Sequence, residues 1–571
     1  MGISTESDKK VKAEAKRDEF RSSRELKEIV SSHIPRSKGE EKKRLQIWLN
    51  FFSIFQTPDE AVSIKTKVAH LEEKLAAKMR NRKEGYIDPK SNTFVVASQN
   101  SMRNTIRTNP DESIRKACFE ATEKLPLDII DEYIEIIKGR NEYARVLGYE
   151  DFYDYKIHLD EGMTKDELFG IFNKIYEETK YAFKNIRDLE KQKPGLRKPW
   201  NFGYMMTGDF SKEEDPYFQF ENVIDLWGRS FSALGIDYKG GSLKLDLLDR
   251  KGKYDNGFCH YPTLVYYKNN RIVPASSNFT SNAIPGQVGS GVDGIYTVFH
   301  EAGHAADRLN SIQKDVCINS EYPPSTVSWS ETHSMFLDAV SSSIEWKTRY
   351  TKDINGNPYP FEIYERKVRA MNPLMPLEMM NIIFVMDFER SIYECKNLTK
   401  DFVISTAKKM NTKYFDRSED SISILNIPHI YSWESSAYYH GYGLAELGVY
   451  QWREYFFKKY GYIVDNPNIG KEMTRVWKIG SLYKSNEFIK IATGKKLSAD
   501  AFLRNVNKTA DEMISIGKSR VERLKKVQLY TKPVKLNAKI SMVHGKLKIS
   551  DNKKSFEDME RRYRAWILKQ K

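Results

Sequence analysis

The 571-residue chain is poor in the residues that cross-link small secreted proteins or anchor membrane proteins. It has four cysteines, and none stands in a CxxC pair: Cys118, Cys259, Cys317 and Cys395. That spacing argues against a disulfide scaffold and against a cysteine-bound structural zinc, and it predicts reduced thiols in a cytoplasmic protein. No apolar run is long enough to span a bilayer, and the first residues lead into mixed charge instead of a secretory segment. We therefore expect no membrane partner.

Nucleotide-binding loops and nucleic-acid motifs are also missing. The glycines between 286 and 294 match neither GxGxxG nor a P-loop. The net charge of +14 would suit an acidic partner, but lysine and arginine alternate with acidic residues along most of the chain. This pattern is typical of a solvated surface, and we expect no nucleic-acid partner.

Histidine is scarce, with ten in the whole chain, yet two of them stand four residues apart in the run His300-Glu301-Ala302-Gly303-His304. On a helix this spacing projects both imidazoles from one face, where they can bind one metal ion, and Glu301 lies beside them as a candidate base. This is the HExxH zinc signature. The plainer alternative is an amphipathic helix with two surface histidines.

A catalytic zinc needs a third protein ligand and an open position for water. The metzincin extension would need a glycine at position 307 and a histidine at position 310, but the chain has Asp307 and Asn310. We expect the third ligand to be Glu331, which stands 27 residues after His304 on a second predicted helix, 328–338. That helix follows a predicted loop that contains Pro323 and Pro324.

Two alternatives to a ligand role for Glu331 stay open. Ser328 and Glu331 also fit a capping box at the start of a helix. Asp307 and Glu321 are weaker candidates for the third ligand.

The HExxH run followed by Glu331-x-x-Ser334 resembles the thimet oligopeptidase and oligoendopeptidase F family of zinc metallopeptidases, in which an ExxS glutamate on the next helix binds zinc. The resemblance spans about residues 100–510. It implies one Zn²⁺ per chain, oligopeptide substrates, and an enclosed channel that admits short unstructured peptides. Asp307 departs from the family, because many members carry a histidine there, but that position is not a ligand.

The resemblance also points to groups that stabilise the oxyanion, since amide hydrolysis builds negative charge on the former carbonyl oxygen. The family has a histidine followed about a dozen residues later by a tyrosine in a G-Y-x-x-small-E context, which is similar to His429 and Tyr442. Tyr439 fits one helical turn earlier, and Tyr438 is a weaker third. Without the resemblance, a stripe of packed aromatic side chains is the simpler interpretation.

The patterns predict a mostly α-helical fold with a small β-sheet next to the HExxH helix. Thr164 and Glu167 form a predicted capping box, and Gly148 ends a predicted helix. Strands are predicted at residues 243–247, 263–267 and 272–280, where an extended peptide could pair with a strand edge. Two more short strands, 534–540 and 545–549, and a last helix are predicted near the C-terminal end.

We divide the chain into an N-terminal helical region (1–200), a catalytic region that forms one fold with it (201–510), and a basic extension of unknown role (511–571). The predicted function is that of a zinc-dependent endopeptidase in which metal-activated water hydrolyses short unstructured oligopeptides. The alternative is a peptide-binding protein that keeps the zinc site with little or no turnover. The sequence does not indicate an oligomeric state.

Overall fold

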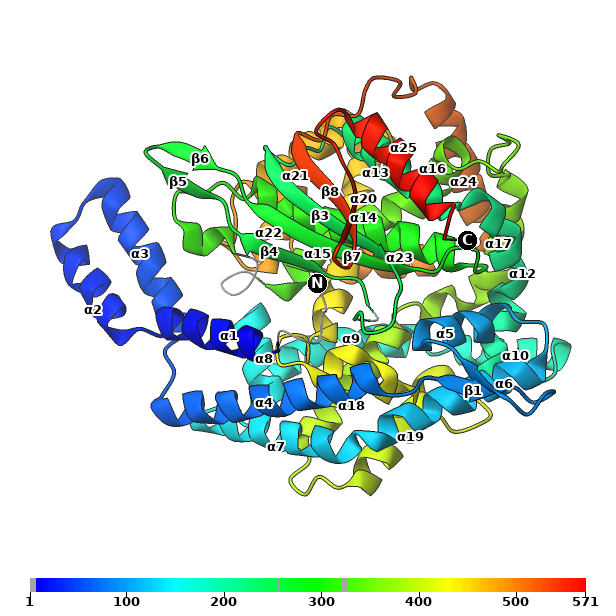
Figure 1. Cartoon of the computed structure of the whole chain (residues 1–571), viewed down its shortest axis with the longest axis horizontal. Helices are drawn as coiled ribbons and strands as arrows, with labels where there is room; N and C mark the ends of the chain where they lie inside the picture. The colour runs from blue at the N-terminus through cyan, green and yellow to red at the C-terminus, as the bar shows by residue number, and fades with distance from the viewer. Residues whose placement is uncertain (1–6, 255, 321–325, 571) are drawn as a thin grey trace.

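The computed structural model describes residues 7–254, 256–320 and 326–570. Two large hydrophobic cores organise them, and each core defines a lobe. Figure 1 shows a lobe built of helices below and a lobe containing the main sheet above. We call them the helical lobe and the sheet lobe.

The helical lobe is an assembly of amphipathic helices, as the sequence predicts. Thr164 and Glu167 form the predicted capping box at the start of α9, and Gly148, with φ of +88°, follows the end of α7. The elements of this lobe are α4 (Asp59–Asn81), β1 (Gly85–Ile87), β2 (Phe94–Val96), α5 (Gln99–Thr108), α6 (Glu112–Lys124), α7 (Ile130–Val146), α8 (Phe152–Glu161), α9 (Lys165–Thr179), α10 (Ala182–Gln192), α11 (Pro199–Gly203), α18 (Met380–Glu394), α19 (Lys400–Phe415) and α23 (Asp500–Val506). The short α12 (Asp209–Glu214) follows in the connection to the sheet lobe.

The sheet lobe packs helices around a five-stranded mixed sheet. Its elements are α13 (Val223–Leu234), β3 (Gly241–Leu248), β4 (Cys259–Thr263), β5 (Tyr266–Lys268), β6 (Arg271–Val273), β7 (Ser276–Ala283), α14 (Ser290–Asn310), α15 (Val327–Ser341), α16 (Ile344–Tyr350), α17 (Phe361–Met371), α21 (Pro467–Trp477), α22 (Ser485–Thr493), α24 (Ala510–Lys525), β8 (Ala538–His544), β9 (Leu547–Asp551) and α25 (Phe556–Ile567).

The sheet has the order β4-β7-β3-β8-β9, with β7, β3 and β8 parallel and β4 and β9 antiparallel at the edges. Leu243, Leu245 and Leu247 alternate along β3 into the core that includes α14, because successive side chains of a strand point to opposite faces. The predicted strand 272–280 is divided between β6 and β7 on either side of Pro274. The last two predicted strands are β8 and β9, and β8 pairs with β3.

One long helix and one protruding segment join the lobes. Helix α20 (Tyr439–Tyr460) places Leu444 in the core of the helical lobe and Trp452 in that of the sheet lobe. Residues 7–55 form an arm of three helices, which Figure 1 shows extending to one side: α1 (Ser7–Arg21), α2 (Arg24–His33) and α3 (Gly39–Ile54).

None of the helices in the described ranges is long and apolar enough to cross a membrane. The division of the chain at residues 200 and 510, the cytoplasmic location and the absence of a nucleic-acid partner stay predictions.

Candidate metal centre

The centre forms where α14 and α15 pack closely together. A Cβ atom on Gly303 would lie 2.9 Å from the Cα of Ser334, so only glycine lets the two helices approach to this distance. The approach brings Glu331 on α15 opposite His300 and His304 on α14. The residues that were expected to bind zinc are therefore neighbours in space.

The donor atoms of these three side chains match the dimensions of a tetrahedral zinc site. Glu331 Oε2 lies 3.3 Å from His300 Nε2 and 3.4 Å from His304 Nε2. Ligands at about 2.0–2.1 Å from a zinc ion at tetrahedral angles lie roughly 3.3–3.4 Å apart. Two imidazoles and one carboxylate also form a donor set that catalytic zinc sites use, so these residues fit the ion.

A further shell of hydrogen bonds fixes the orientation of these side chains. His300 Nδ1 lies 2.8 Å from Asp338 Oδ2, which leaves Nε2 for a metal. The Tyr438 hydroxyl donates to Glu331 Oε1, and the Ser334 hydroxyl donates to Glu331 Oε2 over 3.2 Å. Sequence reasoning missed Asp338, although it stands seven residues after Glu331 and so on the same face of the helix.

Glu301 follows His300 on α14, lines the wall of the cavity and is 5% exposed. Burial raises the pKa of its carboxyl to about 7. Residue 257 covers it, and a Cβ atom at that position would lie 3.0 Å from Glu301 Oε1 and 2.4 Å from Thr297 Cγ2. Glycine at 257 thus allows the backbone to pass directly over the carboxylate.

His429 and Tyr442 face the same cavity. Tyr442 Oη lies 3.1 Å from His429 Nε2, and His429 Nδ1 has no hydrogen-bond partner among the described residues. Burial lowers the pKa of His429 to about 4, so the ring is neutral at pH 7 and carries one N–H. Tyr438 also lines the cavity, whereas Tyr439 packs against the core of the helical lobe.

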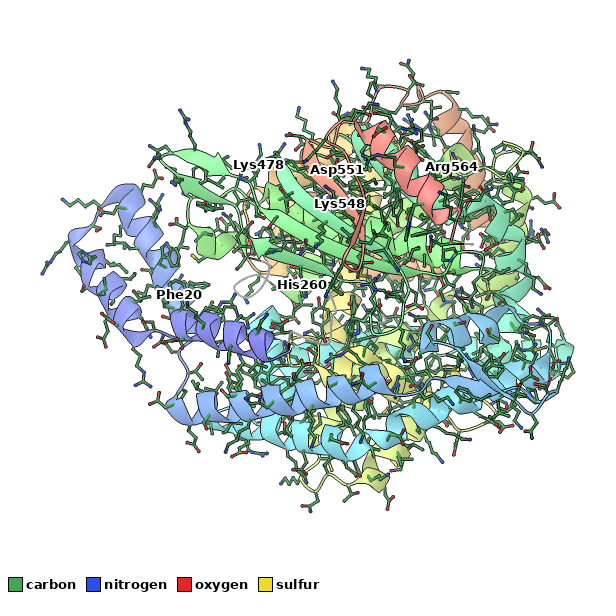
Figure 2. The ribbon with its side chains drawn as sticks, viewed as in Figure 1. Phe20, His260, Lys478, Lys548, Asp551 and Arg564 are labelled. Atoms are coloured by element: carbon green, nitrogen blue, oxygen red, sulfur yellow. The ribbon has the colours of Figure 1, made fainter. Side chains whose placement is uncertain are left out.

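A cavity of about 1860 Å³ lies between the lobes and contains the whole centre. Helix α4 and residues 428–442 line it on one side, and α14 and residues 249–260 line it on the other. The edge strand β4 borders it through Cys259 and His260, and Figure 2 labels His260 at the side of the sheet that faces the helical lobe.

The alternatives for Glu331 have different outcomes. The capping box is wrong, because the N-cap of α15 is Thr326, whose hydroxyl accepts from Trp329 N. Ser328 donates its N–H and its hydroxyl to Glu161 on α8. Asp307 is buried in an ion pair with its neighbour Arg308. Glu321 and the predicted proline loop lie outside the described residues.

Comparisons with known proteins agree with this geometry. No curated protein matches the chain. A structure assigned as an oligoendopeptidase F has a TM-score of 0.62 at 16% identity, over 88% of this chain and 86% of that one. PZ peptidase A, solved with an inhibitor, gives 0.63 at 15%, over 90% and 87%. An M32 carboxypeptidase from Deinococcus radiodurans gives 0.56 at 13%, over 87% and 90%.

At these identities the solved structures establish the fold. The predicted mostly α-helical class, with a small sheet beside the HExxH helix and an enclosed channel, is confirmed. A model described as Peptidase family M3 matches residues 105–508, which is more than half of the chain. The family resemblance predicted from the sequence is confirmed as well: the chain is a peptidase and belongs to peptidase family M3.

Proposed function

We propose that the chain is a zinc-dependent endopeptidase that hydrolyses short unstructured oligopeptides. One observation carries the proposal: His300, His304 and Glu331 present donor atoms at the spacing of a tetrahedral zinc site, on the wall of the cavity between the lobes. A buried carboxylate, Glu301, stands beside them.

His300, His304 and Glu331 would hold one zinc ion. A zinc ion in such a site supplies Lewis acidity, which polarises a carbonyl and brings the pKa of water toward neutrality. Glu301 would then take the proton of the attacking water and return it to the leaving nitrogen as the peptide bond breaks. Residue 257 leaves no room for a side chain over Glu301, so the backbone itself forms the cavity wall beside this carboxylate.

His429 and Tyr442 would stabilise the oxyanion. The neutral His429 ring can carry its proton on Nε2, 3.1 Å from Tyr442 Oη, so that the Tyr442 hydroxyl keeps its own proton to donate to the oxyanion. The buried Nδ1 atom is not a donor in this arrangement. A hydroxyl donor of this kind, aimed at the developing charge, is worth about 10²–10³ in kcat. Tyr439 has no such role in this proposal.

The edge of β4 would bind the backbone of the peptide. Within the described parts of the chain this strand has no neighbour in the sheet beyond its antiparallel partner β7, and Cys259 and His260 border the cavity. An extended peptide that adds to a strand edge is bound through main-chain groups, so the side chains of the peptide matter little. A folded protein cannot offer such a strand inside an enclosed cavity.

The test is cleavage of unstructured peptides of graded length by protein of measured zinc content, beside the Glu301→Gln variant. We expect internal cleavage by the native protein, and retained zinc with at least 10³-fold slower turnover in the variant. Zinc-loaded protein that binds peptides without cutting any would establish the peptide-binding alternative. Release of single C-terminal residues would overturn the endopeptidase assignment.

A further inference from the structure

The segment between His429 and Tyr438 is held at three points by ionisable side chains from distant helices, of which Arg140 and Glu389 are buried and Glu72 is partly buried. Arg140 Nη1, on α7, donates to the carbonyl of Ile430 over 2.9 Å. Trp433 N donates to Glu72 Oε2, on α4, over 2.9 Å. In the third contact, Ala437 N donates to Glu389 Oε1, on α18, over 2.8 Å.

Arg140 and Glu72 act on this segment as one unit. Arg140 is fully buried, and its Nε and Nη2 atoms donate to Glu72 Oε1 over 3.2 and 2.9 Å. Its Nη1 atom also donates to the hydroxyl of Tyr393. The two oxygens of Glu72 are divided, because Oε1 receives Arg140 while Oε2 receives the backbone of Trp433. The ion pair thus fixes a carbonyl and an N–H that lie three residues apart.

An ion pair between a buried guanidinium and a partly buried carboxylate is a poor source of net stability, since the cost of desolvation offsets most of the attraction. Apolar residues would fill the same space at similar stability, but they could not direct hydrogen bonds at two chosen backbone groups. What this pair adds is direction, and both of its backbone targets lie within four residues of His429.

The position of the His429 ring depends on that backbone. His429 lies in a single 3-10 turn, η10 (Pro428–Tyr431), and the carbonyl that Arg140 binds belongs to the next residue in the turn. The ring itself has one side-chain hydrogen bond, to Tyr442. The rings of Tyr438 and Tyr439 also pack against it, at 6.1 and 5.3 Å between centroids. These contacts limit the tilt of the ring, but where the ring lies among them is set by the backbone that carries it.

We propose that Arg140 and Glu72 are positioning residues that hold His429 in line with the scissile carbonyl. The proposal rests on the proposed function, in which His429 stabilises the oxyanion. Arg140 reaches the reaction only through the backbone of residue 430. Glu72 also lines the cavity between the lobes, so a peptide that packs on α4 contacts the same unit that aligns His429.

The test compares Arg140→Lys and Glu72→Gln with a matched control, Arg115→Lys. Arg115 is a second buried arginine of the helical lobe that donates to backbone carbonyls, those of Trp200, Asn109 and Pro110, away from the segment at 430–437. Lysine keeps the charge, but its three donors share one nitrogen, so it cannot reproduce the planar fork that reaches Glu72 on one side and the carbonyl of Ile430 on the other. Loss of alignment of about 1 Å can cost 10²-fold in rate.

We expect Arg140→Lys to lower kcat by 10- to 100-fold with KM and zinc content unchanged, and Glu72→Gln to lower it less. Arg115→Lys should lose thermal stability to a similar extent but keep kcat. Equal kcat in Arg140→Lys and Arg115→Lys would overturn the proposal and leave the pair as scaffold.

A second readout does not need turnover. The ¹⁵N signals of the His429 ring, assigned with His429→Gln, should move in Arg140→Lys and stay in place in Arg115→Lys. If the native protein cuts no peptide while these signals move, the proposed function fails and the positioning of His429 stands. Unmoved signals in Arg140→Lys would overturn the positioning, whatever the activity.

Discussion

Asp338 shows how a residue outside the ligand set can decide whether the metal binds. Its Oδ2 atom lies 2.8 Å from His300 Nδ1, so it sets the tautomer that presents Nε2 to the metal. We expect Asp338→Asn to weaken zinc binding by about 10- to 100-fold. Competition with a fluorescent chelator measures this. Asp293→Asn, on α14 with His300 but about half exposed and paired with Arg107, should bind zinc as the native protein does.

Removal of one hydroxyl group from Tyr442 or from Tyr439 tests which tyrosine stabilises the oxyanion. Tyr442 reaches His429 and the cavity, whereas Tyr439 packs its ring against His429 and against the core of the helical lobe without lining the cavity. We expect Tyr442→Phe to reduce kcat by about 10²-fold, because one donor to the oxyanion is lost while the ring remains. Tyr439→Phe removes the same hydroxyl group from a neighbouring ring, and a comparable loss there would reverse the assignment. Steady-state kinetics on one peptide suffices.

The site residues that can be predicted from the sequence are those whose relative positions are fixed within one helix. The spacing of His300 and His304 fixes their common face within one helix, and the structure brings both to one point with Glu331. The choice between Tyr439 and Tyr442 is not local, since residues three apart share a helix face. It depends on how α20 packs between two lobes, and no residue near the tyrosines encodes that.

At the scale of the elements, the position of the first turn of α15 matters for the metal site, because this helix carries Glu331. Glu161, at the end of α8, accepts hydrogen bonds from Ser328 N and Ser328 Oγ, and burial raises its pKa to about 8. The folded state therefore holds this proton between pH 4.5 and 8, where the unfolded state has lost it. The stability that this proton contributes is present below pH 4.5 and is lost as the pH rises to 8.

We therefore expect Glu161→Gln to flatten the decline in stability between pH 5 and 8 and to exceed the native protein in stability at pH 9. The glutamine oxygen still accepts from Ser328 but never ionises. Thermal unfolding at a series of pH values measures this. Glu178→Gln, an exposed site on α9, serves as the control. If the stability of Glu161→Gln declines between pH 5 and 8 as steeply as that of Glu178→Gln and the native protein, Glu161 does not have this role.

The strands show which parts of an element can be predicted from its own residues. Alternation of leucines predicts β3 correctly, since burial of every second side chain is a local pattern. The pairing of β3 with β8, almost 300 residues later, depends on contacts that no local pattern contains. Pro274 interrupts the predicted strand 272–280, because proline has no N–H to donate to a neighbouring strand.

At the scale of the whole molecule, the arm is a second connection between the lobes. Helix α20 is buried in both lobe cores, whereas the arm touches each lobe from outside. Its helix α1 lines the cavity with Val11 and Arg17, and Arg17 donates to Glu434 of the helical lobe. Its helix α3 reaches the sheet lobe, where Arg44 Nε and Trp48 Nε1 both donate to Asp315 over 3.0 Å.

Apolar packing completes that contact. Phe51 and Phe52 of α3 form a small core with Cys317 and Ile318, and the Asp315 side chain at its edge is only 5% exposed. Figure 2 labels Phe20 on the inner side of the arm, where its ring meets Phe52 at 5.8 Å between centroids. The arm therefore closes one side of the cavity through a contact that is small compared with the two lobe cores.

A contact of this size can be weakened without unfolding either lobe. We expect the double substitution Arg44→Ala with Trp48→Ala to release α3 from the sheet lobe and to raise kcat/KM for long peptides several-fold. Short peptides should be cut at the native rate, because the metal ligands and His429 lie elsewhere. Hydrogen exchange of residues 39–54 reports the release, and Arg24→Ala, exposed on the same arm, is the control. If exchange rises in α3 while the length limit stays unchanged, the two lobes alone set the size of the substrate, and the arm contributes only stability.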